Sequence, residues 1–289
     1  MENNSTKWYL LSFLGCVWGS SFILMQFGLK GVNSIQLGSL RILFAGLFLM
    51  IVGYKHIPKI PLYKWKHIAL TSLFGTFIPA YLFAIALSKI DGSVSAILNS
   101  LTPLNTLLVG LFFFGLDVQR RQIFGVIIGF VGCVLLVLFG DGENTTENYY
   151  YAILIVIASL FYGINVNLIK KYLSDLKPLT ISTGNFVIMF VPALIVLYFT
   201  GFFDVLHESK VQTSLGFIAV LGIVGTGFSN ILFFKLIQLS SPVFASSVTY
   251  IIPVVAFILG FLFMKESLSI IQLLGAFIVL IGVYFSSRK

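Results

Sequence analysis

The fourth long apolar run of the chain carries a line of polar side chains. One helix face is formed by residues at intervals of four, three and four: Ser95, Asn99, Thr102 and Thr106. Their hydroxyl and amide groups can hydrogen-bond a solute or a neighbouring helix. Within a membrane such groups are costly and face a cavity or a partner helix. We interpret Asn99 and Thr102 as cavity-lining, with hydrogen bonding between packed helices as the alternative.

A proline stands beside this polar face. Pro103 has no amide hydrogen and deprives the carbonyl of Asn99 of its helical partner, which predicts a kink and an unpaired acceptor. In the ninth apolar run, Thr249 and Tyr250 occupy the positions that match Asn99 and Ser100. Tyr250 offers an aromatic wall with a hydroxyl tip. We therefore include both Thr249 and Tyr250 among the candidates.

Other runs carry polar or aromatic residues at mid-depth. Tyr162 and Asn165 are three residues apart and share a helix face. Trp18 lies near the middle of the first run, where it packs against either a core or a cavity. The candidate substrate-binding residues, including weaker ones in the third and eighth runs, are Trp18, Tyr81, Asn99, Thr102, Tyr162, Asn165, Ser229, Asn230, Thr249 and Tyr250.

Two basic residues lie within apolar runs. Arg41 is about 10 Å from the outer end of the second run, at 1.5 Å per helical residue. It could hold a substrate carboxylate, or it could snorkel outward or bond carbonyl groups of neighbouring helices. We favour the second interpretation, because this run is expected at the periphery. Lys235 is also interpreted as snorkelling, and Lys265 with Glu266 as a hinge ion pair or helix cap.

Carboxylates and imidazoles are missing from the depth of the apolar runs. His56, His67 and His207 fall in loops or at their edges, and Cys16 and Cys133 lie inside runs. Metal ligation and nucleophile–base chemistry need such groups close together, so we expect no metal, no cofactor and no enzyme. A proton-coupled carrier usually keeps a titratable group at mid-membrane, which favours facilitated export or exchange here.

The composition places the chain in a membrane. Of its 289 residues 58% are hydrophobic and only 10% charged, whereas soluble domains carry about a quarter charged residues. The net charge of +8 comes from basic residues in short loops, which fits the positive-inside rule and not nucleic-acid binding. A lipoprotein signal ending at Cys16 is disfavoured, because the apolar run continues past it.

Ten runs meet the length of about 20 residues that a membrane-spanning helix needs. They cover residues 8–27, 34–54, 67–87, 93–116, 122–139, 149–169, 179–200, 214–237, 243–264 and 269–286. Counting Lys and Arg in the loops gives twelve on the side of the termini and four on the other. We therefore expect both termini in the cytoplasm.

The two halves of the chain repeat one pattern. Pro103 and Gly125 recur 150 positions later as Pro253 and Gly275, and Trp18 matches Tyr162 at an offset of 144. We expect two units of five spans, residues 1–147 and 148–289. An odd number of spans inverts the second unit, as in many secondary transporters with a midplane site.

These repeats resemble the drug/metabolite transporter superfamily, in its EamA-type branch. The residues that carry the resemblance are Trp18-Gly19-Ser20-Ser21-Phe22, Leu40-Arg41-Ile42-Leu43-Phe44-Ala45, Ala86-Leu87, Ser93-Val94-Ser95-Ala96, Pro103, Pro253 and Met264-Lys265-Glu266. Leu116-Asp117 and Lys235 depart from the family pattern. The resemblance implies ten helices around a central cavity lined by spans one, three, four, six, eight and nine. It also implies export or exchange of small metabolites, often amino acids, across a bacterial inner membrane.

Together these observations predict an all-α membrane protein that acts as a secondary transporter by alternating access. Amide, hydroxyl and aromatic groups without buried acids suit a small neutral or zwitterionic solute, such as an amino acid. The alternative is a channel or lipid-moving protein without a discrete site. The expected partners are the substrate and the lipid bilayer, and a homo-oligomer is compatible with the apolar surface.

Overall fold

The computed structural model describes residues 2–90, 92–138, 149–264 and 270–286. Every regular element within these ranges is helical, as the composition predicted. The expected hinge at Lys265 and Glu266 lies outside the described residues, and so does the expected boundary between residues 147 and 148.

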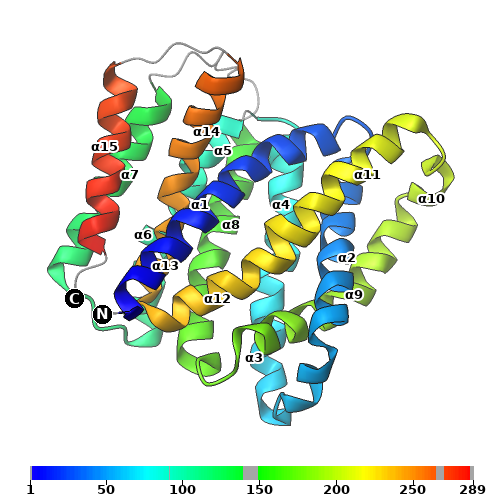
Figure 1. The fold of residues 1–289 in the computed structure, drawn as a ribbon, viewed down its shortest axis with the longest axis horizontal. Helices are drawn as coiled ribbons and strands as arrows, with labels where there is room; N and C mark the ends of the chain where they lie inside the picture. Colours follow the sequence, from blue (N-terminus) through cyan, green and yellow to red (C-terminus); the bar gives the residue numbers. More distant parts are fainter. Residues whose placement is uncertain (1, 91, 139–148, 265–269, 287–289) are drawn as a thin grey trace.

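Helical segments occur at all ten predicted positions (Figure 1). The first half contains α1 (Glu2–Gly28), α2 (Ser34–Gly53), η1 (Tyr54–Lys59), η2 (Leu62–Lys64), α3 (Trp65–Ser72), η3 (Leu73–Phe77), α4 (Ile78–Leu87), α5 (Gly92–Asn99), α6 (Thr102–Val109), η4 (Gly110–Phe114) and α7 (Arg120–Leu138). The second contains α8 (Tyr149–Leu168), η6 (Ile169–Leu173), α9 (Pro178–Phe199), α10 (Phe202–Val205), α11 (Ser209–Gly222), η7 (Ile223–Phe228), α12 (Ser229–Leu239), α13 (Pro242–Ser246), α14 (Val248–Met264) and α15 (Ile270–Ser286).

The helices have the length and hydropathy of membrane spans. Six helical segments of the described residues are long and apolar enough to cross a membrane, and shorter apolar helices cover Thr102–Phe114, Pro242–Val255 and Leu274–Ser286. Apolar side chains also cover much of the outer surface, as a protein surrounded by lipid requires. The protein is therefore an all-helical, multi-pass membrane protein, and ten crossings stay a prediction.

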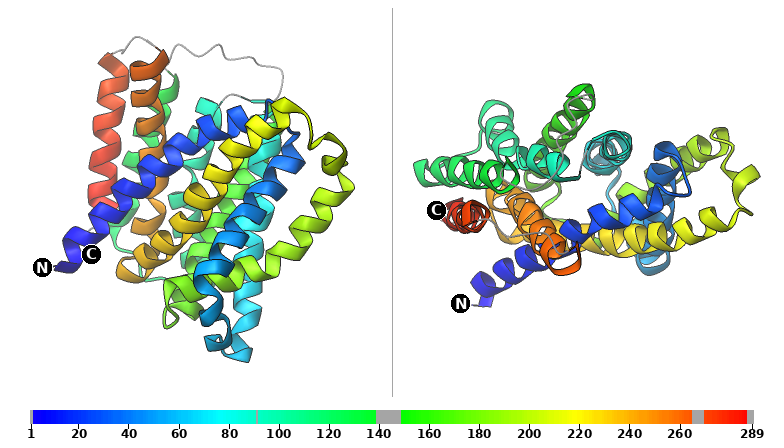
Figure 2. Two further views of the ribbon diagram at one scale, coloured as in Figure 1. Left: turned by 45° about the vertical axis from the view of Figure 1, so that its right-hand side comes forward. Right: turned by 90° about the horizontal axis from the view of Figure 1, so that it is seen from above.

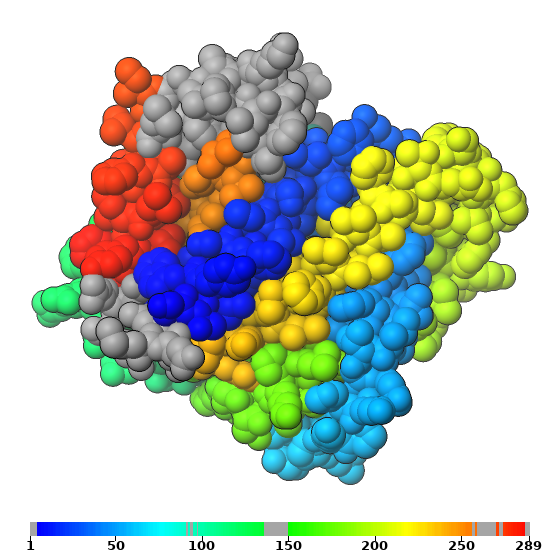
Figure 3. Space-filling model, viewed as in Figure 1, coloured from blue at the N-terminus to red at the C-terminus, as the bar shows by residue number. Residues whose placement is uncertain are grey.

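Helices of the two halves pack against each other in matched pairs. α1 lies along α14 and α8 lies along α6, so the first helix of each half contacts the fourth-span helices of the other (Figure 2). α2 packs on α9, and α7 packs on α15. In Figure 3, α1 crosses the visible face between α14 and the α11–α12 segment. The centre of the bundle is thus enclosed by helices from both halves.

The α7–α15 pair depends on glycine. A Cβ atom on Gly282 would lie 2.3 Å from the backbone nitrogen of Gly129, and one on Gly125 would lie 2.4 Å from the nitrogen of Ser286. Only residues without a side chain allow the two backbones to approach this closely. Gly125 and Gly129 stand four residues apart on one face of α7, which is the spacing of a close helix contact.

The spans that surround the centre are irregular in matched places. The fourth span is divided into α5 and α6, and the ninth into α13 and α14. The third and eighth spans each contain a π-helical turn, η3 and η7. Thr76 in η3 and Thr226 in η7 stand 150 positions apart, as do the two prolines of the repeat. Breaks and π turns widen a helix locally and are frequent at functional sites.

Candidate substrate cavity

A cavity lies between the two halves, and side chains of both halves form its wall. It is lined by segments of spans one, three, four, six, eight and nine, as the family resemblance implied, and additionally by Arg41 of α2. The polar side chains and the tryptophan at its wall are Trp18, Ser21, Arg41, Thr76, Asn99, Thr102, Tyr162, Asn165, Thr226, Asn230, Ser246 and Thr249.

Seven of the ten candidate residues lie at this cavity: Trp18, Asn99, Thr102, Tyr162, Asn165, Asn230 and Thr249. They come from α1, α5, α6, α8, α12 and α14. The structure thus brings together side chains that are far apart in the chain. Their contact with a substrate stays a prediction.

The other three candidates are directed elsewhere. Tyr250 is fully buried, and its hydroxyl donates to the carbonyl oxygen of Val126 on α7 at 2.7 Å. The hydroxyl of Ser229 donates back to Val224 within its own helix at 2.8 Å. Tyr81 shares a 2.9 Å hydrogen bond with Ser39 of α2. None of these three is among the residues that line the cavity, and each hydroxyl has a hydrogen-bond partner within the protein.

The polar face of the fourth span divides between two roles. Asn99 and Thr102 lie at the cavity, whereas the hydroxyl of Thr106 donates to the carbonyl of Thr102 at 2.8 Å and stays buried. Asn167 of α8 donates to the carbonyl of Thr106 at 2.9 Å, which joins two helices. Ser95 is buried outside the cavity. Cavity lining and helix packing thus both apply to this face.

A side-chain hydrogen bond spans the break between α5 and α6. The hydroxyl of Thr102 donates to the carbonyl oxygen of Asn99 at 2.7 Å. The carbonyl that Pro103 was expected to leave unpaired therefore has a partner. The break between α13 and α14 has a similar hydrogen bond: the hydroxyl of Thr249 donates to the carbonyl of Ser246 at 3.0 Å. Both breaks keep short hydroxyl side chains at the cavity wall.

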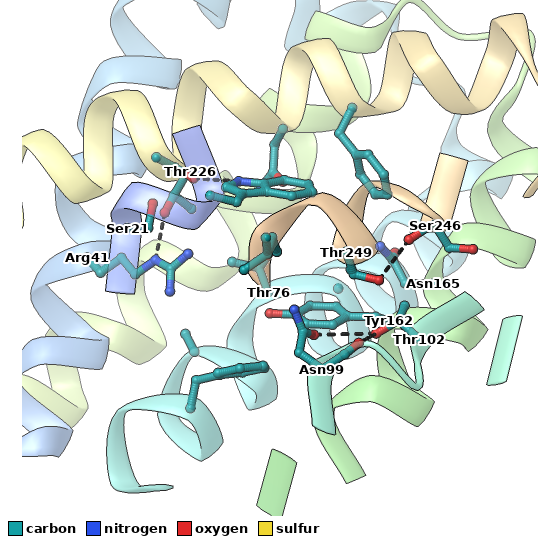
Figure 4. Close-up of a pocket in the computed structure, with 18 of the residues that line it drawn as sticks. Ser21, Arg41, Thr76, Asn99, Thr102, Tyr162, Asn165, Thr226, Ser246 and Thr249 are labelled. Atoms are coloured by element: carbon teal, nitrogen blue, oxygen red, sulfur yellow. Dashed lines mark hydrogen bonds between the residues drawn. The ribbon is translucent and has the colours of Figure 1, made fainter. Parts of the chain in front are cut away.

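The cavity has two chemically different ends (Figure 4). At one end Arg41 donates from Nε to the hydroxyl of Thr226 at 2.7 Å, close to Ser21. At the other end the amides of Asn99 and Asn165 lie among hydroxyl groups. The carboxamide oxygen of Asn165 is buried and has no hydrogen-bond partner in the described structure.

Aromatic side chains form the wall between these ends. The ring of Tyr162 stacks on Phe83 with centroids 6.0 Å apart. Trp18 packs edge-on against Phe233 at 5.0 Å, and its indole nitrogen donates to the carbonyl of Gly225 at 2.9 Å. The cavity therefore offers apolar contact as well as hydrogen bonds.

Sequence reasoning missed several lining residues. Arg41 was interpreted as peripheral, yet it reaches into the cavity. Thr76, Thr226 and Ser246 were not proposed. The first two could have been found from the repeat, because they match at the same offset of 150 as Pro103 and Pro253. Lys235, in contrast, is exposed and does not line the cavity.

Basic side chains join helix ends away from the cavity. Lys64, which is buried, forms an ion pair with Asp175. This hydrogen bond lowers the pKa of the Asp175 carboxyl below its ordinary value. Lys170 donates to the carbonyl oxygens of Ile237, Gln238 and Ser240, at 3.1, 3.2 and 2.7 Å. A cation at the last carbonyls of a helix is favourable.

The described part of the chain brings no three His, Cys, Asp or Glu side chains close enough together to hold a metal ion. No Asp, Glu or His stands among the described residues that line the cavity. What the site can do chemically is to bind a solute through hydrogen bonds, aromatic contact and one guanidinium group.

Proteins similar to this chain are named as transporters. An "uncharacterized transporter" of Archaeoglobus fulgidus is 26% identical, over 98% of this chain and 99% of its own. The "uncharacterized inner membrane transporter YedA" of Escherichia coli K12 is 26% identical, over 92% and 86%. An "S-adenosylmethionine/S-adenosylhomocysteine transporter" of Chlamydia muridarum is 22% identical, over 90% and 84%.

Structure and family comparisons agree on the fold. A crystal structure with 16% identical residues superposes with a TM-score of 0.72, over 98% of this chain and 96% of its own. The profile of the EamA-like transporter family matches twice, over residues 6–138 and 150–288. These two matches include every helix that lines the cavity. The chain belongs to the EamA-like transporter family.

Proposed function

We propose that the protein is a secondary carrier for a small neutral or zwitterionic metabolite, such as an amino acid or a related compound. The observation that carries this proposal is the cavity between the two halves, with amide, hydroxyl and aromatic side chains contributed by both. A discrete site of this kind suits a carrier better than a channel or a lipid-moving protein. The Chlamydia muridarum relative is named for two solutes that contain an amino-acid group, S-adenosylmethionine and S-adenosylhomocysteine.

Alternating access is supported by the paired irregularities. The split helices α5–α6 and α13–α14 and the π turns η3 and η7 occur at matched positions around one cavity. If the two halves are inverted repeats, rocking one against the other opens the same site to either side of the membrane. We place the protein in a bacterial inner membrane, with both termini in the cytoplasm. Cysteines introduced near residues 120 and 207 and labelled in intact cells test this orientation.

The direction is proposed to be export or exchange without a proton relay. No lining residue among those described is a carboxylate or an imidazole, and a guanidinium does not titrate in the physiological range. Uptake driven by an imposed pH gradient alone, without a membrane potential, would contradict this part of the proposal.

Counterflow in proteoliposomes tests the carrier. We expect saturable exchange of at least some members of a panel of labelled amino acids. Asn99→Ala, which removes a cavity amide, should raise the half-saturation concentration. Asn105→Ala is the matched control, because Asn105 bonds Ser159 at 2.8 Å outside the cavity. Flux that never saturates would indicate a channel, and equal effects of both variants would assign Asn99 to packing.

A further inference from the structure

Arg41 is held within the bundle and directed toward its centre. Its Nε donates to the hydroxyl of Thr226 at 2.7 Å, and Nη1 lies 3.8 Å from the sulfur of Met25. Thr226 belongs to η7 and Met25 to α1, so the guanidinium contacts two other spans. Part of its surface remains open to the cavity. Figure 4 shows the side chain extending from α2 toward the cavity interior.

This placement contradicts the snorkelling interpretation. Arg41 stands seven residues after the first residue of α2, about 10 Å along the helix. A snorkelling side chain extends toward the helix end and the lipid headgroups. The hydrogen bond to Thr226 holds Arg41 in the other direction, between α2 and the second half of the protein.

The contacts of Arg41 leave most of its hydrogen-bonding capacity unused. A guanidinium has five N–H donors, and it remains charged at any physiological pH. The described structure gives it one oxygen acceptor and one sulfur, and no ion pair with a described carboxylate. A cation inside a membrane protein is costly unless an anion accompanies it. Carboxylates match the guanidinium fork best, because two parallel hydrogen bonds form at once.

The opposite end of the cavity has the complementary requirement. Asn165 is 3% exposed, and its carboxamide oxygen has no partner among the described residues. A buried acceptor without a donor costs free energy. A solute N–H that reaches Asn165 would supply that donor, and the side chain of Asn99 also lines the cavity.

We propose that Arg41 binds an anionic group of the transported solute, a carboxylate. This assignment rests on the proposed function and narrows it from neutral or zwitterionic solutes to those with a carboxylate. Thr226 is a positioning residue: its hydroxyl accepts from Arg41 and donates to the carbonyl of Leu221 at 3.1 Å, which fixes the guanidinium against η7.

Matched solutes that differ only in the carboxylate test the proposal. L-leucine with L-leucinamide and L-phenylalanine with L-phenylalaninamide are compared for binding to the purified protein, by thermal shift and by competition in counterflow. The wild-type protein should prefer the carboxylate of at least one pair by about 10-fold or more, since charge-assisted hydrogen bonds are the strong ones. Arg41→Gln should abolish this preference, because it should weaken binding of the carboxylate about 10-fold more than binding of the amide.

Arg41→Lys separates the effect of the positive charge from the effect of the planar guanidinium group. It keeps the cation without the fork, so it should retain part of the preference. Thr226→Val keeps the shape of η7 and releases Nε, and should reduce the preference by less than Arg41→Gln does. The melting temperature of each variant without solute shows whether it is folded.

Three results overturn the proposal. One is a wild-type protein that binds no carboxylate more tightly than its amide. Another is an Arg41→Gln variant that weakens carboxylate and amide equally, which would assign a structural role to Arg41. The third is an Arg41→Gln variant that binds both the carboxylate and the amide as tightly as the wild-type protein does. Carboxylate binding without counterflow would contradict the carrier and leave the Arg41 site standing, so the two failures are distinguishable.

Discussion

The indole nitrogen of Trp18 donates a hydrogen bond to the carbonyl oxygen of Gly225 at 2.9 Å, across 207 positions of sequence. Trp18 belongs to α1 and Gly225 to the π turn η7. A π turn shifts the helical hydrogen-bond pattern by one residue, and here the carbonyl of Gly225 accepts from a donor outside its own helix. The contact ties the first span to the eighth at the wall of the cavity.

Trp18→Phe is expected to lower stability and weaken solute binding together. It removes the hydrogen bond to Gly225 while keeping an aromatic ring against Phe233. The loss should be about 1 kcal/mol, with a raised half-saturation concentration in counterflow. Trp8→Phe is the control, because Trp8 packs edge-on against Phe244 outside the cavity. Equal half-saturation values for both variants would count against a role for Trp18 at the site.

Tyr250→Phe should affect stability and not binding. The substitution deletes the 2.7 Å hydrogen bond to the carbonyl oxygen of Val126, at a cost of about 1 kcal/mol. Thr249→Val, one position earlier, changes a residue of the cavity wall and should raise the half-saturation concentration. Thermal denaturation in detergent measures the stability of the two variants, and counterflow measures their half-saturation concentrations. A binding defect in Tyr250→Phe with normal stability would restore the aromatic-wall interpretation.

Gly282→Val should prevent α7 and α15 from packing. Its Cβ would meet the backbone nitrogen of Gly129 at 2.3 Å, a contact that flexible side chains cannot relieve. We expect loss of folded protein in fluorescence-detected size-exclusion chromatography. Gly216→Ala is the control: a Cβ there meets no atom within 4 Å, and alanine favours a helix by about 1 kcal/mol. A Gly282→Val protein as stable as the control would contradict the close approach.

Asp175→Asn should alter stability in a pH-dependent way. The pKa of the Asp175 carboxyl is lowered by its hydrogen bond with Lys64. The folded protein therefore favours the deprotonated carboxylate more than the unfolded chain does. The stabilisation is present above the unfolded pKa and is lost as pH falls through the lower folded pKa. It is small, within about 1 kcal/mol, because the carboxylate side chain is 63% exposed.

Melting temperatures measured between about pH 3 and 6 check this sign. Wild type should exceed Asp175→Asn near pH 6, and the difference should shrink toward pH 3. A difference that grows in acid would mean that the ion pair does not stabilise the folded state.

The repeat allowed most of the site to be predicted. Asn99 and Thr249 were found as matched residues of the fourth and ninth spans, and both lie at the cavity. The same comparison would have added Thr76 and Thr226. Tyr250 shows the limit of the repeat comparison. Its matched residue is Ser100, which does not line the cavity and bonds its own helix at 2.9 Å, whereas the preceding residue Asn99 does line it.

The sequence by itself determined the all-helical membrane class and the family. Both follow from local sequence patterns. A long apolar run in a membrane must satisfy its backbone hydrogen bonds internally as a helix, and a repeat keeps a constant offset between matched residues. The direction of each side chain was decided only by tertiary structure. In a span that is apolar on all sides, hydropathy does not distinguish the lipid face from the packed face or the cavity. Arg41 therefore looked peripheral in sequence, and the neighbouring η7 turn is what holds it at the cavity.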